Sequence, residues 1–126
     1  MRSVELLESF GRENQLDEKS IYGLMLALEE CAANVIHHAY HDRAHEKFQV
    51  RFDATDEQLT IELRDTGPPF DPTIAETNET DVDPDERPPG GWGIQLVRRY
   101  MDEIVYARDE NENVLRMVKR VAIPGL

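Results

Sequence analysis

Two stretches in the middle of the chain, 48–54 and 59–63, alternate apolar and polar residues, and the short connection TDEQ separates them. This alternation predicts two antiparallel strands that form a hairpin, each with one apolar face. A sheet of this kind is covered by helices on one side only, while its other side faces water. The rest of the chain must therefore supply helices for one face of a sheet.

Two segments before the hairpin have helical periodicity. Residues 3–13 repeat apolar side chains at helical spacing, and Asp17 is a good N-cap for a longer helix that runs to about Tyr40. One apolar stripe follows the longer helix and comprises Ile21, Leu24, Met25, Leu28, Ala32, Val35 and Ile36.

A third helix is expected after the hairpin, in the stretch GGWGIQLVRRYMDEIV, and two closing strands at 104–108 and 114–122. The apolar face of this helix is assigned to Ile94, Val97, Tyr100 or Met101, and Ile104. The order helix, helix, strand, strand, loop, helix, strand, strand predicts a two-layer α+β sandwich.

The segment 66–91 has no periodicity and carries six of the seven prolines and a dense run of acidic residues. Loops longer than about 15 residues are uncommon in compact domains unless they are lids, binding loops or disordered segments. The acidic run itself is typical of a solvated loop. A long loop therefore lies between a strand end and a helix N-terminus.

The chain has 126 residues, which indicates one domain, 1–126, with a hydrophobic core of its own. Its net charge of −12 disfavours direct binding of nucleic acid. No apolar run is long enough for a membrane span, and the N-terminus lacks the apolar core of a secretory signal. With a single cysteine, Cys31, a reducing, cytoplasmic setting fits best.

The long helix carries the first candidate site. Glu30 and Asn34 stand four residues apart and share a helix face. A carboxylate and a carboxamide one turn apart can orient a nucleophile and hold a divalent cation such as Mg²⁺, which prefers oxygen ligands. By spacing alone, a surface Glu–Asn pair without function is the more frequent explanation of such a match.

The stretch RDTGPPFDP, residues 64–72, is the second candidate. Asp65 follows a strand, where its carboxylate can accept a hydrogen bond from the exocyclic amine of adenine, and Gly67 lets a flat ring approach the backbone. A rigid turn in which Asp65 bonds local backbone amides explains the same residues equally well.

The third candidate is the glycine-rich stretch Gly90-Gly91-Trp92-Gly93 directly before a helix. Backbone N–H groups at such a point can face a phosphate, although a flexible loop explains the glycines too. The stretch is not a P-loop, because no Gly-Lys-Ser/Thr follows, and no strand precedes it as the dinucleotide fingerprint requires.

Taken together and in this order, EECAANVIHHAY, DTGPPFDP and GGWGIQLVRRYMDEIVY closely resemble the three ATP-site boxes of the GHKL (Bergerat-fold) ATPases. The resemblance is nearest to the small anti-sigma-factor serine/threonine kinases and extends over about residues 3–121. It implies a histidine-kinase-like α/β sandwich with a mixed, mostly antiparallel sheet and helices on one face. It also implies that residues 72–90 form the ATP lid.

The resemblance also implies a role for each matching residue. Glu30 would be the general base and Asn34 the Mg²⁺ ligand. Asp65 would read the adenine amine with Gly67 beside the ring, and the backbone amides of the second glycine box, at Gly91 and Gly93, would meet the phosphates.

Two departures from the family pattern concern the strands. Many relatives begin with a strand before the first helix, whereas this sequence starts almost at the helix, so either the sheet has no such edge strand or the strand comes from residues outside this sequence. Many also carry a threonine near the adenine in the last strand, where this chain reads Asn113-Val114-Leu115. The first departure leaves open a missing edge strand, and the second leaves open that contact to the base.

The function implied is a Mg·ATP-dependent serine/threonine protein kinase that phosphorylates a small anti-anti-sigma-type partner, with a sigma factor as a second partner and a homodimer as a common state. The alternative is a nucleotide-gated binding module with little or no phosphotransfer. A detached ATPase half of a sensor kinase is disfavoured, because the chain has no dimerisation hairpin with a phosphoacceptor histidine. Three histidines at helical spacing, His37, His41 and His45, suggest a less favoured transition-metal site.

Overall fold

The computed structural model describes residues 2–36, 48–74 and 93–126. Over these ranges the chain forms three α-helices, four strands and a short 3-10 turn. In chain order they are α1 (Arg2–Glu13), α2 (Glu18–Asn34), β1 (Gln49–Ala54), β2 (Gln58–Asp65), η2 (Pro72–Ile74), α3 (Gly93–Tyr100), β3 (Glu103–Asp109) and β4 (Glu112–Arg120).

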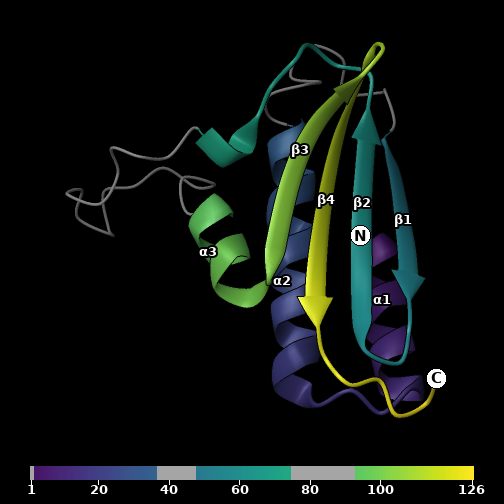
Figure 1. Ribbon diagram of the computed structural model, residues 1–126. Coiled ribbons are helices and arrows are strands. Elements are labelled where there is room, and N and C mark those ends of the chain that lie inside the picture. The colour runs from purple at the N-terminus through teal and green to yellow at the C-terminus, as the bar shows by residue number, and fades with distance from the viewer. Residues whose placement is uncertain (1, 37–47, 75–92) are drawn as a thin grey trace.

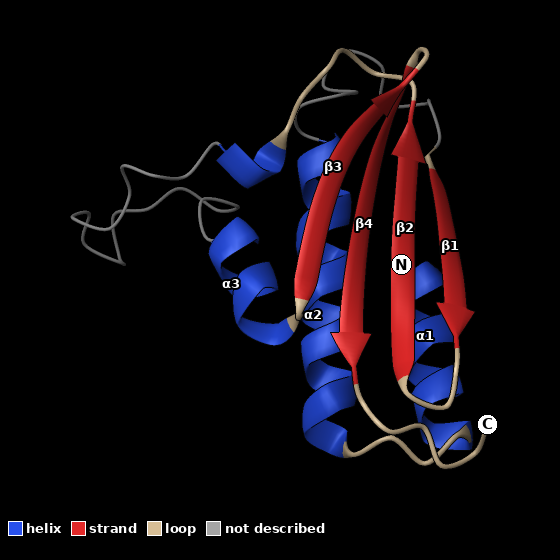
Figure 2. Ribbon diagram, viewed as in Figure 1, coloured by secondary structure: helices blue, strands red, loops and turns tan. Residues whose placement is uncertain are grey.

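The four strands form one sheet in the order β1-β2-β4-β3. Helices α1 and α2 run across one face of it, and α3 lies beside β3 at the edge (Figures 1 and 2). This arrangement confirms the expected two-layer α+β fold with helices on one face. Each pairing between the described strands is antiparallel, so the parallel component that a mixed sheet would need is not among them.

The strand periodicity places the apolar side chains as the sequence predicts. In β2, Leu59, Ile61 and Leu63 are almost fully buried, whereas the alternate residue Glu62 is only partly so. Ile61 is paired with Phe52 on one side and Met117 on the other. Because successive side chains point to opposite faces, this register puts the apolar residues of all three strands on the helix-covered face.

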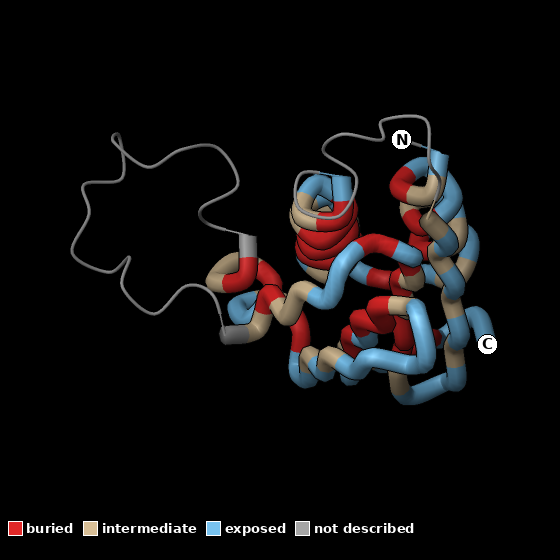
Figure 3. The backbone as a smooth tube through the Cα atoms, turned by 90° about the horizontal axis from the view of Figure 1, so that it is seen from above, coloured by how far each residue is buried: buried red, intermediate tan, exposed pale blue. Residues whose placement is uncertain are grey.

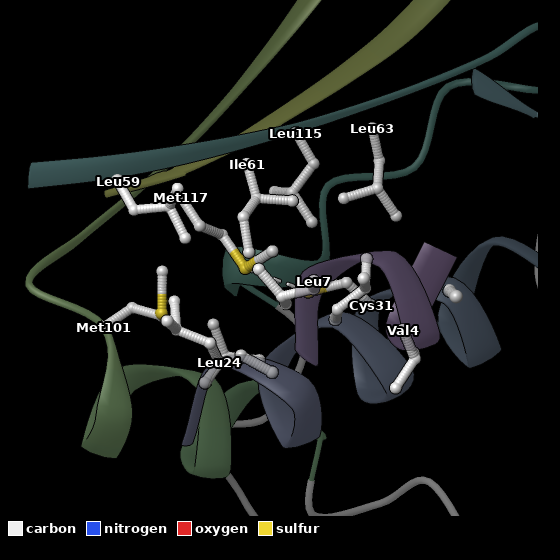
Figure 4. Close-up of a cluster of buried hydrophobic side chains, with 14 of the residues drawn as sticks. Val4, Leu7, Leu24, Cys31, Leu59, Ile61, Leu63, Met101, Leu115 and Met117 are labelled. Carbon is white, nitrogen blue, oxygen red and sulfur yellow. Dashed lines mark hydrogen bonds between the residues drawn. The ribbon is translucent and has the colours of Figure 1, made fainter. Parts of the chain in front are cut away.

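The core lies between the helices and the sheet, where buried residues concentrate in the view from above (Figure 3). Side chains from α1, α2 and the strands meet there, among them Leu7, Leu24 and Ile61 (Figure 4). One apolar residue of the expected helix stripe is outside this core: Ile36 is 52% exposed.

Asp17 caps α2 as its sequence position predicts. Its carboxylate accepts a hydrogen bond from the backbone N–H of Ser20 at 3.3 Å, which satisfies one of the free N–H groups of the first turn. The two N-terminal helices approach closely at Gly11, where an added Cβ would lie 2.8 Å from Ile21. At this distance a side chain at position 11 would displace Ile21, which explains a glycine inside α1.

The third helix is shorter than its apolar pattern suggested. It ends at Tyr100, and Ile104 lies in β3, partly buried against the core. Of the two assignments made for Ile104 from the sequence, the one to the helix face was therefore wrong and the one to the closing strand 104–108 is confirmed. A turn over 101–102 reverses the chain, and the Asp102 carboxylate accepts a hydrogen bond from the backbone N–H of Arg120. The apolar residue at 104 faces the core through strand alternation instead of helical spacing.

Two expectations lie outside the described residues. The extension of the second helix to Tyr40 falls within 37–47, and the lid falls largely within 75–92. Only the first residues of the expected lid are described, as the turn η2. No strand precedes α1 in the part of the chain that the structure describes.

Candidate functional site

Two of the three sequence candidates, at Asn34 and Asp65, approach one another at one end of the molecule. There β2 ends at Asp65, α2 ends at Asn34, and η2 crosses from the sheet edge towards α3 (Figure 1). The C-terminus and the α1–α2 connection lie at the opposite end. Asn34 and Asp65 come close together because the C-terminal ends of α2 and β2 point in the same direction.

A small pocket, with an internal volume of about 20 Å³, lies at this end, between α2, the sheet and η2. Sites for small ligands combine an apolar lining with a few polar groups. This one has an apolar part formed by Cys31, Val35, Phe70, Pro72 and Leu115, and a polar part formed by Asn34, Asp65, Tyr106 and Asn113. Its lining, more than its size, suits a flat, largely apolar ring that carries polar edge groups.

Asp65 is the charged group of the pocket and is only 6% exposed. Its Oδ1 accepts two hydrogen bonds at 2.9 Å, one from the backbone N–H of Gly67 and one from Nδ2 of Asn113. The bond to Gly67 is the local turn contact that the simpler interpretation expected. Within the described part of the chain Oδ2 has no hydrogen-bond donor, so the carboxylate holds the turn with one oxygen while the other oxygen has no bond to the described protein groups.

The carboxamide of Asn113 joins the last strand to this turn. It lies opposite Asp65 in the β2–β4 register, and besides Asp65 it bonds the carbonyl of Pro68 at 2.8 Å, the N–H of Phe70 at 3.3 Å and the hydroxyl of Tyr106. In the sequence, position 113 was only a departure from the family pattern. Its role depends on strand register, which no local spacing reveals.

Arg108 is a second residue that sequence reasoning missed. Its Nη1 donates to the carbonyl of Gly67 at 2.8 Å, so β3 and β4 both hold the turn that follows β2. Gly67 itself is buried. The motif at 65–67 is fixed by contacts with residues more than 40 positions later in the chain.

Asn34 lines the pocket, whereas Glu30, one helical turn before it, does not. Glu30 is partly buried on the same helix face. Burial and, to a smaller extent, repulsion from Glu29 raise the pKa of the Glu30 carboxyl above its ordinary value. A raised pKa makes the ionised side chain a stronger proton acceptor than an exposed glutamate. The arrangement leaves the Glu30 carboxyl outside the pocket lining and places the neutral carboxamide of Asn34 in it.

Cys31 lies in the apolar wall, with its Sγ 3.4 Å from Sδ of Met117. Burial, assisted by the charge of Glu30, raises the pKa of the Cys31 thiol to about 12. The residue therefore packs as a small hydrophobic side chain and is not a nucleophile near neutral pH.

The second glycine box is described only in part. Gly93 begins α3, and Gly91 lies outside the described residues. Arg98 of α3 donates to the carbonyl of Thr73, which ties this helix to η2 at the pocket wall. The histidines at 37, 41 and 45 also lie outside the described ranges, and within those ranges no group of three His, Cys, Asp or Glu side chains is placed to hold a metal ion.

A family model described as a histidine kinase-like ATPase domain matches residues 2–119. The chain therefore belongs to this family, and the resemblance inferred from the three sequence boxes is confirmed. Family membership accounts for the α+β layers and supports the use of ATP.

Two curated relatives are named as protein kinases. The serine/threonine-protein kinase BtrW of Bordetella bronchiseptica is 24% identical over 116 residues, which is 92% of this chain and 82% of that protein. The serine-protein kinase RsbW of Bacillus velezensis is 30% identical over 91 residues, which is 67% of this chain. The match spans only 55% of that RsbW, so this chain corresponds to about half its length.

A solved structure gives the same fold. The histidine kinase domain of the blue-light activated histidine kinase EL346 from Erythrobacter litoralis matches with a TM-score of 0.50 and 25% identity, over 83% of this chain and 47% of that one. Among the described helices, none has the length and apolar character to cross a membrane.

Proposed function

We propose that the chain binds Mg·ATP in the pocket between α2, β2 and β4 and transfers the γ-phosphoryl group to a serine or threonine hydroxyl of a small partner protein. The observation that carries this proposal is the buried Asp65 carboxylate, which lines the pocket and keeps Oδ2 without a donor in the described part of the chain. A buried charged oxygen without a donor is costly. The exocyclic amine of adenine has the chemistry to satisfy it.

Two residues of α2 would supply the metal ligand and the general base. Asn34 presents a carboxamide to the pocket, and its oxygen is a suitable ligand for Mg²⁺, which would neutralise phosphate charge when bound. Glu30, one turn earlier with its raised carboxyl pKa, would accept the proton of the attacking hydroxyl. The backbone N–H groups of the second glycine box, at Gly91 and Gly93, would bind the phosphates, with 72–90 as a lid.

The partner is assigned by resemblance: an anti-anti-sigma-type protein as the phosphoacceptor, and a sigma factor as the binding target of a homodimer. The names of BtrW and RsbW as serine or serine/threonine kinases support the reaction class. The whole domain, 1–126, would act in a cytoplasmic setting.

Phosphotransfer and binding can be measured separately. Titration calorimetry with Mg·ADP gives the affinity, and transfer of label from γ-labelled ATP to a panel of anti-anti-sigma-type proteins gives the activity. Glu30→Gln is expected to keep the affinity for ADP within about 3-fold and to lose about 100-fold or more in transfer, because general-base catalysis contributes roughly 10²–10⁴-fold. Glu13→Gln, at the exposed end of α1, is the matched control and should leave both unchanged.

Three results would contradict the proposal in different ways. Failure of the wild-type chain to bind ADP would reject the nucleotide site. Tight ADP binding with no transfer to any partner would reject the kinase and favour a nucleotide-gated binding module. Equal transfer by wild type and Glu30→Gln would reject Glu30 as the general base.

A further inference from the structure

The carboxamide of Asn113 has used its whole hydrogen-bonding capacity. It is 5% exposed. Its Nδ2 donates to Asp65 Oδ1 at 2.9 Å and to the Pro68 carbonyl at 2.8 Å, and its Oδ1 accepts from the Phe70 N–H at 3.3 Å and from the Tyr106 hydroxyl. A carboxamide has two N–H donors and two acceptor lone pairs. Asn113 therefore has no remaining group with which to contact a ligand directly.

The same bonds fix which way the carboxamide faces. Nδ2 points at a carboxylate oxygen and a carbonyl, and Oδ1 points at an N–H and a hydroxyl. The flipped amide would set its oxygen against two acceptors, so only one orientation satisfies all the bonds. A side chain with a single satisfied orientation is a rigid support for its neighbours.

The neighbour that gains most from this support is Asp65. Gly67 and Asn113 both donate to its Oδ1, and two donors on one oxygen hold the plane of the carboxylate. Oδ2 is then the oxygen that can accept a hydrogen bond from a ligand in the pocket. The residue as a whole is only 6% exposed. Without Asn113 only the bond from Gly67 would remain, and the carboxylate could turn about its terminal torsion, which is intrinsically broad.

We propose that Asn113 is a positioning residue that sets the base selectivity of the nucleotide pocket by holding the Asp65 carboxylate with Oδ2 towards the amine of the base. The inference rests on the proposed nucleotide site and adds to it the residue that enforces the choice of base. Asn113 itself makes no contact with the nucleotide. Its effect on binding passes through Asp65 and through the turn at 67–70.

Selectivity is measured as a ratio of two affinities. Titration calorimetry would give the affinities for ADP and for purine riboside diphosphate, which differs from ADP only by the missing amine. In the wild type the ratio should be about 10–100, as expected for a hydrogen bond to a buried charged group. In Asn113→Leu, which keeps a similar side-chain shape, it should fall to within about 3-fold of unity, chiefly through weaker binding of ADP.

Two further variants separate positioning from a general loss of stability. Asn14→Leu is the matched control: it removes another partly buried carboxamide, which donates to the Phe10 carbonyl at 3.0 Å at the end of the molecule away from the pocket. It should lower the melting temperature and keep the wild-type ratio. Tyr106→Phe deletes one bond to Asn113 but keeps the Asn113–Asp65 bond, so its ratio should lie between those of the wild type and Asn113→Leu.

A merely structural role for Asn113 predicts a different outcome. Both affinities would then fall by the same factor, and the ratio would stay near that of the wild type, which would overturn the inference. If Asn113→Leu fails to fold, Tyr106→Phe decides alone, and an unchanged ratio in it would overturn the inference as well. Absence of ADP binding by the wild type would instead reject the nucleotide site itself.

Discussion

The close approach of α2 and α3 at Gly23 allows a quantitative test of how the third helix is positioned. A Cβ added at Gly23 would lie 2.6 Å from Cδ1 of Tyr100, 3.0 Å from its Cγ and 3.1 Å from its Cβ. These atoms belong to the root of the side chain and the near edge of the ring, so rotation of the side chain cannot clear all three. A methyl group at position 23 therefore forces α3 away from α2.

Two effects of known size oppose each other in Gly23→Ala. Alanine in a helix interior is favoured over glycine by roughly 1 kcal/mol. Overpacking a close contact costs about 1–3 kcal/mol. The difference predicts that Gly23→Ala lowers the free energy of unfolding by up to about 2 kcal/mol, whereas the same change at an unhindered helix position would raise it.

A double-mutant cycle with Tyr100→Ala isolates the steric term. Without the ring the two shortest contacts disappear, and only Cβ of residue 100, at 3.1 Å, remains close. In that background Gly23→Ala should be neutral or stabilising by up to about 1 kcal/mol, which gives a coupling of about 1–3 kcal/mol. The edge-on contact between the rings of Tyr22 and Tyr100, with centroids 6.1 Å apart, is lost in both Tyr100→Ala arms and cancels in the cycle.

Urea denaturation followed by circular dichroism gives the four free energies of unfolding. Because α3 begins at Gly93, in the second glycine box, the displaced helix should also weaken ADP binding in Gly23→Ala. A rise of about 1 kcal/mol in the stability of Gly23→Ala, with no coupling to Tyr100→Ala, would refute the packing argument.

Three further outcomes are expected. Glu29→Gln removes the repulsion that helps to raise the pKa of the Glu30 carboxyl, so the acidic limb of the pH–transfer profile should move to lower pH; an unmoved limb would mean that Glu30 is not the titrating base. The raised pKa of Cys31, about 12 against the ordinary 9.0, means that the folded state retains the thiol proton while the unfolded state loses it. The free energy of unfolding should therefore fall between about pH 9 and 12, by at most ~1.4 kcal/mol per pH unit from this group. Alkylation of the Cys31 thiol at pH 8 should require unfolding, and rapid alkylation of the native protein would contradict the burial. Leu28→Ala, at a fully buried position of α2, should cost about 2–5 kcal/mol in urea denaturation, and a loss below about 1 kcal/mol would show that the core closes around the cavity.

Most of the fold could be predicted because its signals are local. The alternation at 59–63 places Leu59, Ile61 and Leu63 on one face, and the structure buries all three. Asp17 caps α2 as predicted. Errors came at element ends, as at Ile104, because an apolar residue there satisfies both the helical and the strand pattern until the turn between them is known.

The candidate site was predictable only in part. The spacing of Glu30 and Asn34 follows from helix geometry, but it is the structure that places Asn34 in the pocket lining and leaves Glu30 outside it. From the sequence, Asp65 was explained equally well as part of a rigid turn and as a carboxylate that hydrogen-bonds a ligand. The structure shows the turn contact through Oδ1 and a second oxygen without a described donor, so the two explanations are compatible.

By itself, the sequence determined which faces are apolar, where α2 begins, and the family, through three boxes in a fixed order. Only the tertiary structure decided that Asn113 supports Asp65, that Arg108 holds Gly67, and that α3 needs a glycine at position 23. Apolar periodicity and helix caps depend on neighbours within a few residues, so they can be predicted from the sequence. The partners of Asp65 and Gly67 stand 48 and 41 positions away, and strand register brings them together only when the sheet forms.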